Sequence, residues 1–145
     1  MDIKTFRLGE LFCGPGGLAC VVLKASVEGF KTEHASASDY DPDTCSTYRR
    51  NITPDNPESV ICENVRNLDI PSLDSIDALT FGFSCNAYSV VGEQKGLDGT
   101  FGPLYTYGVK ALKSIILVIE SGLQERWCKR TIFFIDLKCC EDQSE

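Results

Sequence analysis

The stretch TFRLGELFCGPGGLA, residues 5–19, decides the fold of this chain. Residues 5–12 have the apolar pattern of a strand, and the glycines at positions 14, 16 and 17 allow a tight turn directly after it. Apolar residues at helical spacing follow: Leu18, Val21, Val22 and Ala25. A strand, a glycine-rich turn and a helix in this order predict a βα unit whose helix begins with free N–H groups.

The rest of the chain continues this alternation. The first helix is predicted to end near Gly29, and Asp41 before Pro42 predicts the N-cap and first turn of a second helix. Further strands are predicted at residues 33–38, 60–62, 76–81 and 131–137, and further helices at residues 42–51 and 104–123. We therefore expect an α/β fold with a mostly parallel sheet, the strands ordered 3-2-1-4-5 and helices on both faces.

Length and composition favour one globular domain. The chain has 145 residues, of which 43% are hydrophobic and 24% are charged, as in ordinary soluble proteins. No apolar run approaches the ~18 to 20 residues that a membrane span requires. The N-terminus lacks the basic and apolar regions of a secretory signal. We therefore expect a cytoplasmic protein that has no membrane partner.

The cysteines and the net charge restrict the function further. Eight cysteines in a chain without a secretory signal are expected to stay reduced. With a single histidine and no Cys-x-x-Cys pair, no metal site is predicted. The net charge of −7 opposes association with nucleic acid, so a DNA contact would have to come from a local patch.

The first candidate site is a cradle for a nucleotide-type cofactor. Asp39 ends the second predicted strand about 20 residues after the glycines, where a carboxylate commonly binds ribose hydroxyls. Tyr40 beside it could pack against an adenine. Gly14-x-Gly16-x-x-Ala19 also satisfies a relaxed dinucleotide fingerprint, so a nicotinamide oxidoreductase is an alternative. The purely structural alternative is a glycine turn followed by an N-capping aspartate, with no ligand.

The second candidate site is a cysteine. The stretch GFSCNAYSVVG, residues 82–92, places Cys85 where a buried strand stops and a loop with glycines every three or four residues begins. A nucleophile at a strand's carboxyl end, followed by a loop able to fold over a substrate, favours covalent catalysis. A free cysteine that acts as a small core hydrophobe is the alternative.

Taken together, three ordered motifs closely resemble the DNA (cytosine-5-)-methyltransferase family over about residues 6–123. They are residues 12–17, residues 39–42, and residues 82–89 with Gly92, Gly96 and Asp98. The resemblance implies a Rossmann-like methyltransferase sheet that binds S-adenosylmethionine. It also implies a double-stranded DNA substrate with its target cytosine flipped out, in many members as part of a restriction–modification system.

The resemblance also implies roles for individual residues. Cys85 would be the nucleophile that adds to carbon 6 of cytosine and so activates carbon 5 for methyl transfer. Asp39 would hold the ribose hydroxyls, and Asn64 would stand where the family has an aspartate that contacts the adenine amino group. The implied cofactor-binding residues are Phe12, Gly14, Gly16, Gly17, Asp39, Tyr40, Asn64 and Val65.

Besides Asn64, the chain departs from the family in three places. Ser84 replaces the proline that precedes the nucleophile, and Asp136 stands where the family has Glu-Asn-Val. After about residue 123 the later motifs are absent, so we expect a partial catalytic domain over residues 1–138, a polar tail over 139–145 and no target-recognition domain. A cofactor-binding fragment without catalysis, or a half-protein that needs a complementing chain, is therefore the alternative function.

Overall fold

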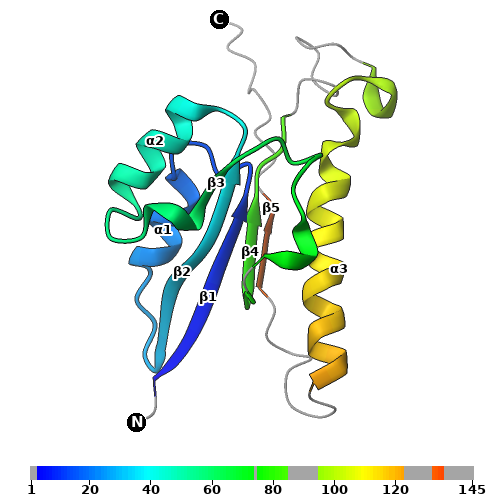
Figure 1. Ribbon diagram of the computed structural model, residues 1–145. Helices are drawn as coiled ribbons and strands as arrows, with labels where there is room; N and C mark the ends of the chain where they lie inside the picture. The colour runs from blue at the N-terminus through cyan, green and yellow to red at the C-terminus, as the bar shows by residue number, and fades with distance from the viewer. Residues whose placement is uncertain (1–2, 74, 85–94, 123–131, 136–145) are drawn as a thin grey trace, which may run out of the picture.

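The computed structural model describes residues 3–73, 75–84, 95–122 and 132–135. Within these residues the strands form one five-stranded sheet in the order β3-β2-β1-β4-β5, with every neighbouring pair parallel (Figure 1). The predicted strand order is therefore confirmed. The strands are β1 Lys4–Leu11, β2 Phe30–Asp39, β3 Val60–Cys62, β4 Ala78–Phe81 and β5 Ile132–Ile135.

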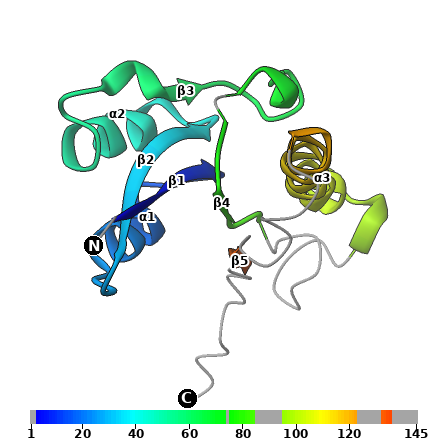
Figure 2. The ribbon, with the colours of Figure 1, turned by 90° about the horizontal axis from the view of Figure 1, so that it is seen from below.

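Helices cover both faces of the sheet, as predicted. Helices α1 (Gly17–Lys24) and α2 (Pro42–Asn51) lie on one face, and α3 (Tyr105–Gly122) lies on the other (Figure 2). Short 3₁₀ turns occupy Pro57–Ser59, Ile70–Ser72, Gly96–Asp98 and Gly102–Leu104. None of the helices in the described part of the chain is both long enough and apolar enough to cross a bilayer.

The start of α2 matches the prediction, whereas the end of α1 does not. The Asp41 carboxylate accepts a hydrogen bond from the Thr44 N–H at 2.8 Å, so Asp41 is the N-cap and Pro42 the first helical residue. The prediction that α1 continues to near Gly29 was wrong: it ends at Lys24, and Ala25 is extended. A turn stabilised by the bond from Phe30 N to Val27 O at 3.0 Å, with Gly29 at φ 77°, starts β2 earlier than predicted.

The core consists of one apolar layer on each face of the sheet. The α1/α2 layer contains Leu8, Cys13, Ala19, Ala37, Cys45, Tyr48, Val60 and Ala78. The α3 layer contains Leu11, Val65, Ile70, Leu79, Phe81, Phe83, Leu104 and Ala111. Because successive side chains of a strand face opposite ways, Glu10 shares the α1/α2 side of β1 with Leu8. A carboxyl group is thereby placed in an apolar layer.

Helix α3 lies directly on β4. An ideal Cβ at Gly108 would come within 2.5 Å of Phe81 Cε2, so no larger residue fits at this contact without a shift. Phe81 also pairs with Leu11 of β1 in the sheet. The close approach at Gly108 therefore fixes α3 against the strand that leads toward residues 82–84.

Candidate functional site

The loop between β1 and α1 has an unusual backbone conformation. Phe12, Gly14 and Gly16 have φ values of 55°, 57° and 98°, all in the left-handed region. Glycine tolerates this region, but for Phe12 it costs roughly 1 to 3 kcal/mol. The N–H of Cys13 donates to Ser38 O at 3.0 Å and so attaches the loop to β2. Strained residues held by their surroundings are common at ligand sites.

Asp39 connects this loop to the next βα unit. Its Oδ2 accepts a hydrogen bond from Gly14 N at 3.0 Å, and its Oδ1 accepts one from Asp41 N at 3.1 Å. A carboxylate has about four acceptor positions, so capacity remains for further donors. The sequence predicts a ligand-binding carboxylate at Asp39; the structure shows that this carboxylate holds the glycine-rich loop, and its ligand-binding role stays a prediction.

The segment after β3 joins the same edge of the sheet. Glu63 N donates to Asp39 O at 3.0 Å, which places Asn64 close to the end of β2. The Asn64 Oδ1 accepts from Arg66 N at 3.1 Å and is thus partly committed to a local turn. The side chain of Tyr40 is 70% exposed, whereas that of Val65 is 7% exposed and packs in the α3 layer. Of these residues, Tyr40 presents the most open apolar surface.

The chain that leads to Cys85 leaves the sheet at this edge too. Leu11 and Phe81 are register partners in parallel strands, so residues 82–84 follow β4 beside the start of the glycine-rich loop. Cys85 itself, like Asp136, lies outside the described residues. The chain is described again from residue 95, and Arg66 Nη2 donates to Thr100 O at 2.6 Å. Nothing in the spacing of the sequence pointed to Arg66 as the residue that makes this connection.

Glu10 lies beneath the glycine-rich loop and was not predicted as a site residue. It is 2% exposed, its Oε2 accepts a hydrogen bond from the Tyr48 hydroxyl at 2.8 Å, and its Oε1 has no hydrogen-bond partner among the described residues. Burial raises the pKa of Glu10 to about 7, although the bond from Tyr48 opposes this. A lone acid in the apolar run of β1 was the available signal.

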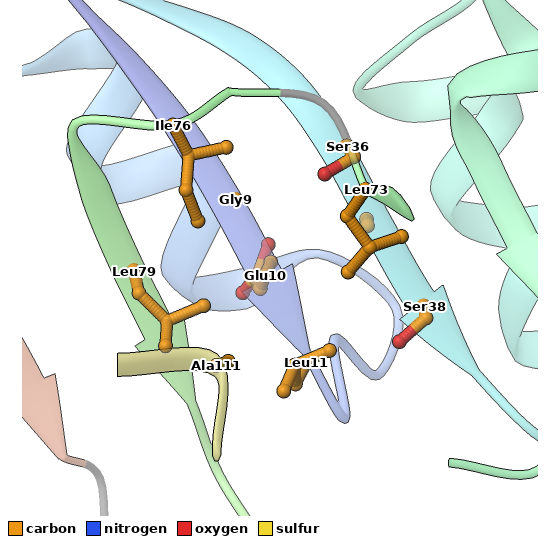
Figure 3. Close-up of a pocket in the computed structure, with 10 residues that line it drawn as sticks. Gly9, Glu10, Leu11, Ser36, Ser38, Leu73, Ile76, Leu79 and Ala111 are labelled. Carbon is orange, nitrogen blue, oxygen red and sulfur yellow. The ribbon is translucent and has the colours of Figure 1, made fainter. Parts of the chain in front are cut away.

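A small cavity on the opposite side of β1 is too small for a cofactor. It has a volume of about 10 Å³ and lies beside Gly9, with Leu73, Ile76, Leu79 and Ala111 around it (Figure 3). That volume is roughly the minimum that one water molecule needs. The cavity is therefore a packing gap. Within the described ranges no three His, Cys, Asp or Glu side chains are grouped to hold a metal ion.

The loop geometry predicts that Gly16→Ala destabilises the protein. A Cβ at Gly16 would lie 2.5 Å from Ile52 Cγ1 and 3.1 Å from Tyr48 Cδ2, and its φ of 98° strains any L-residue. We expect the free energy of unfolding in urea to fall by about 1 to 3 kcal/mol. Gly17→Ala is the matched control, because a Cβ at Gly17 meets nothing within 4 Å. Equal stability of the two variants would contradict the close packing at Gly16.

The burial of Glu10 predicts that stability falls as the pH rises. Between pH 4.5 and about 7 the folded protein keeps a proton on Glu10 that the unfolded chain has lost. Glu10 therefore contributes a progressive destabilisation of the folded state through this window, of about 3 kcal/mol, while His34, whose pKa is lowered by burial, contributes in the opposite direction. In urea titrations from pH 4.5 to 7.5, Glu10→Gln should lose this part of the pH dependence. The exposed Glu58→Gln should keep it, and an unchanged slope in Glu10→Gln would refute the assignment.

Comparison with known proteins places the chain in a family. Residues 6–116 match the model of the C-5 cytosine-specific DNA methylase family. The chain is 52% identical to the Type II methyltransferase M.BbvI of Brevibacillus brevis, over 82% of this chain and 36% of the relative. It is 34% identical to the Type II methyltransferase M.PspPI of Psychrobacter, over 96% of this chain and 33% of the relative. The chain thus spans about a third of the length of these curated relatives.

Solved structures show the same fold. The Entamoeba histolytica methyltransferase EhMeth has a TM-score of 0.53 at 16% identity, covering 91% of this chain and 38% of its own. The S. pombe Dnmt2 methyltransferase has a TM-score of 0.50 at 17% identity, covering 77% and 31%. The predicted Rossmann-like methyltransferase sheet is therefore confirmed. From the match over most of its length, this chain belongs to the C-5 cytosine-specific DNA methylase family.

Proposed function

We propose that this chain is the cofactor-binding and nucleophile-bearing part of a cytosine-5 DNA methyltransferase of the Type II restriction–modification kind. The observation that carries the proposal is the Asp39 carboxylate, hydrogen-bonded to Gly14 N within a stretch that matches the family. The same family match disfavours the nicotinamide oxidoreductase. The glycines at positions 14 and 16, which gave the dinucleotide fingerprint, lie within the matched residues and are accounted for by the methyltransferase motif.

The residues at this edge fit S-adenosylmethionine. Asp39 has acceptor capacity left for two ribose hydroxyls, and the exposed ring of Tyr40 offers a surface for adenine. A Cβ at Gly14 or Gly17 would meet nothing within 4 Å, so the backbone there faces open space that a ligand can enter. Phe12, Gly16, Asn64 and Val65 would shape the walls of the site, Gly16 and Val65 from beneath. When bound, the cofactor supplies an electrophilic methyl group.

Cys85 would carry the covalent step on the DNA base. Carbon 5 of cytosine is a weak nucleophile, and addition of the Cys85 thiolate at carbon 6 makes it electron-rich enough to accept a methyl group. Loss of the carbon 5 proton and elimination of the thiolate then restore the aromatic ring. The base must leave the duplex to be reached. Ser84 gives the nucleophile a less restricted backbone than proline would.

Catalytic turnover needs more polypeptide than the third of the relatives' length that this chain covers. The net charge of −7 disfavours DNA binding by these residues alone, and the curated relatives extend far beyond the match. We propose that the DNA-recognising segments come from further polypeptide, either continuous with this chain or supplied by a complementing chain. The second candidate function, cofactor binding without catalysis, describes the 145 residues acting alone.

Cofactor binding tests the first half of the proposal. Titration calorimetry should show S-adenosylmethionine binding in preference to NAD, and Asp39→Asn should weaken it about 10- to 100-fold, since a charge-assisted hydrogen bond contributes ~1.5 to 3 kcal/mol. Asp41→Asn is the matched control, because asparagine caps a helix as well as aspartate does. Thermal unfolding of each variant separates a lost contact from a lost fold. Tighter binding of NAD, unaffected by Asp39→Asn, would support the oxidoreductase instead.

Covalent trapping tests the second half. The chain is mixed with a fragment of M.BbvI that covers the part beyond the matched region, together with cofactor and a duplex that carries 5-fluorocytosine. Fluorine cannot leave as a proton does, so the adduct should accumulate at Cys85 and be absent in Cys85→Ser. Cys20→Ser should trap normally. An adduct on another cysteine, or trapping that survives Cys85→Ser, would defeat the assignment of the nucleophile.

A further inference from the structure

Two cysteines flank the segment of Asp39 and Tyr40. Cys45, in the first half of α2, is fully buried, and its Sγ donates a hydrogen bond to Asp39 O at 3.5 Å. Cys62, the last residue of β3, is exposed, and its Sγ donates to Tyr40 O at 3.9 Å. The two thiols therefore bond to successive carbonyl groups of one short segment. Asp39 is also the register partner of Cys62 in the sheet.

The two thiols also interact with each other. Burial, and then the neighbouring Cys62 thiol, raise the pKa of Cys45 to about 12. The other ionisable groups around Cys45 are Asp39 on β2, Arg49 on α2, and Cys13 in the glycine-rich loop. Cys13 is only 5% exposed, so Cys62 is the member of this group that a soluble reagent can reach.

We propose that Cys45 and Cys62 form a redox-active thiol pair that a small organic disulfide converts to a disulfide bond. Cys62, as its thiolate, attacks one sulfur of glutathione disulfide, and the other glutathione leaves as a thiolate. Cys45 then loses its proton and attacks the Cys62 sulfur, which releases the second glutathione. Two protein thiols are oxidised, one glutathione disulfide is reduced to two thiols, and the two protons pass to the departing glutathiones.

The geometry gives the two steps of the reaction different requirements. The first step occurs at an exposed sulfur, whereas the second needs the thiolate of a buried cysteine, which is a minor species at neutral pH. The second step is nevertheless intramolecular. Both sulfurs are hydrogen-bonded to the same segment, residues 39–40, and this gives Cys45 a high effective concentration at Cys62. Closure should therefore accelerate as the pH rises, and the mixed disulfide at Cys62 should be short-lived in the native chain.

Closure would also act on the proposed cofactor site, and this part rests on the proposed function. A disulfide sulfur has no proton to donate, so the carbonyl groups of Asp39 and Tyr40 would both lose their thiol donors. The new bond would also fix α2 to β3 with the Cβ atoms of Cys45 and Cys62 about 3.8 Å apart. The backbone that carries the Asp39 carboxylate would shift, and S-adenosylmethionine should bind several-fold more weakly to the oxidised protein.

Peptide mapping tests the thiol pair without reference to the cofactor. The chain is incubated with glutathione disulfide at pH 8, quenched with N-ethylmaleimide and digested with trypsin. Arg49 and Arg50 lie between the two cysteines, so a disulfide would link two separate peptides. We expect that linked pair in the native chain and in Cys20→Ser. In Cys45→Ser we expect a stable glutathione adduct on Cys62, with circular dichroism to confirm that the variant is folded.

Two results would overturn the proposal. One is a native chain in which Cys62 stops at the glutathione adduct, and the other is a disulfide that joins Cys45 to Cys13 in place of Cys62. Calorimetry with S-adenosylmethionine on reduced and oxidised protein is a separate readout. If the reduced protein fails to bind, the proposed function fails and the thiol pair stands. If reduced and oxidised proteins bind equally, only the coupling between them is refuted.

Discussion

The carboxylate of Asp39 is the contact on which the candidate site depends. It accepts one hydrogen bond from the glycine-rich loop after β1 and another from the start of α2, so a single side chain joins two successive βα units. The loop cannot hold its left-handed conformation alone, because Phe12 is strained there. The group proposed to bind ribose therefore also builds the surface on which the rest of a ligand would lie.

Features that are costly for folding gather around this loop. Glu10 is buried beneath it with one oxygen unpaired, Phe12 has a positive φ, and Gly16 leaves no space for a Cβ. The buried carboxyl group and the strained backbone each raise the free energy of the folded chain by about 1 to 3 kcal/mol, whereas glycine at position 16 avoids the clash that a larger residue would make there. Their concentration at one edge of the sheet agrees with a ligand site there, because strained and unpaired groups are common at such sites.

The sequence predicted the architecture well because the signals that set it are local. Strand order followed from the alternation of βα units, and the start of α2 followed from Asp41 and Pro42. The end of α1 was predicted too late because the helical spacing of apolar residues continues past Lys24. In the structure the turn between Val27 and Phe30 takes the place of a further helical turn. The partners of Glu10 and Arg66 come from distant segments, at Tyr48 and Thr100, and spacing along one strand or loop cannot show such pairs.

The same limit applies to the site residues. Asp39 was predicted from its distance to the glycines, but its bond to Gly14 N became visible only when β1 and β2 were placed side by side. Likewise, the eight cysteines were expected to be reduced, and the four in the described residues, Cys13, Cys20, Cys45 and Cys62, are free. That two of them meet at Asp39 and Tyr40 depends on the packing of α2 against β3.

A crystal structure of the chain with S-adenosylhomocysteine is the sharpest test of the proposed cofactor site at Asp39. We expect both ribose hydroxyls to lie within hydrogen-bonding distance of the Asp39 carboxylate and the adenine to pack on the Tyr40 ring. The amino-acid part of the ligand should pass over Gly14. A ligand bound at another edge of the sheet, or a ribose that leaves Asp39 bonded only to Gly14 and Asp41, would contradict it.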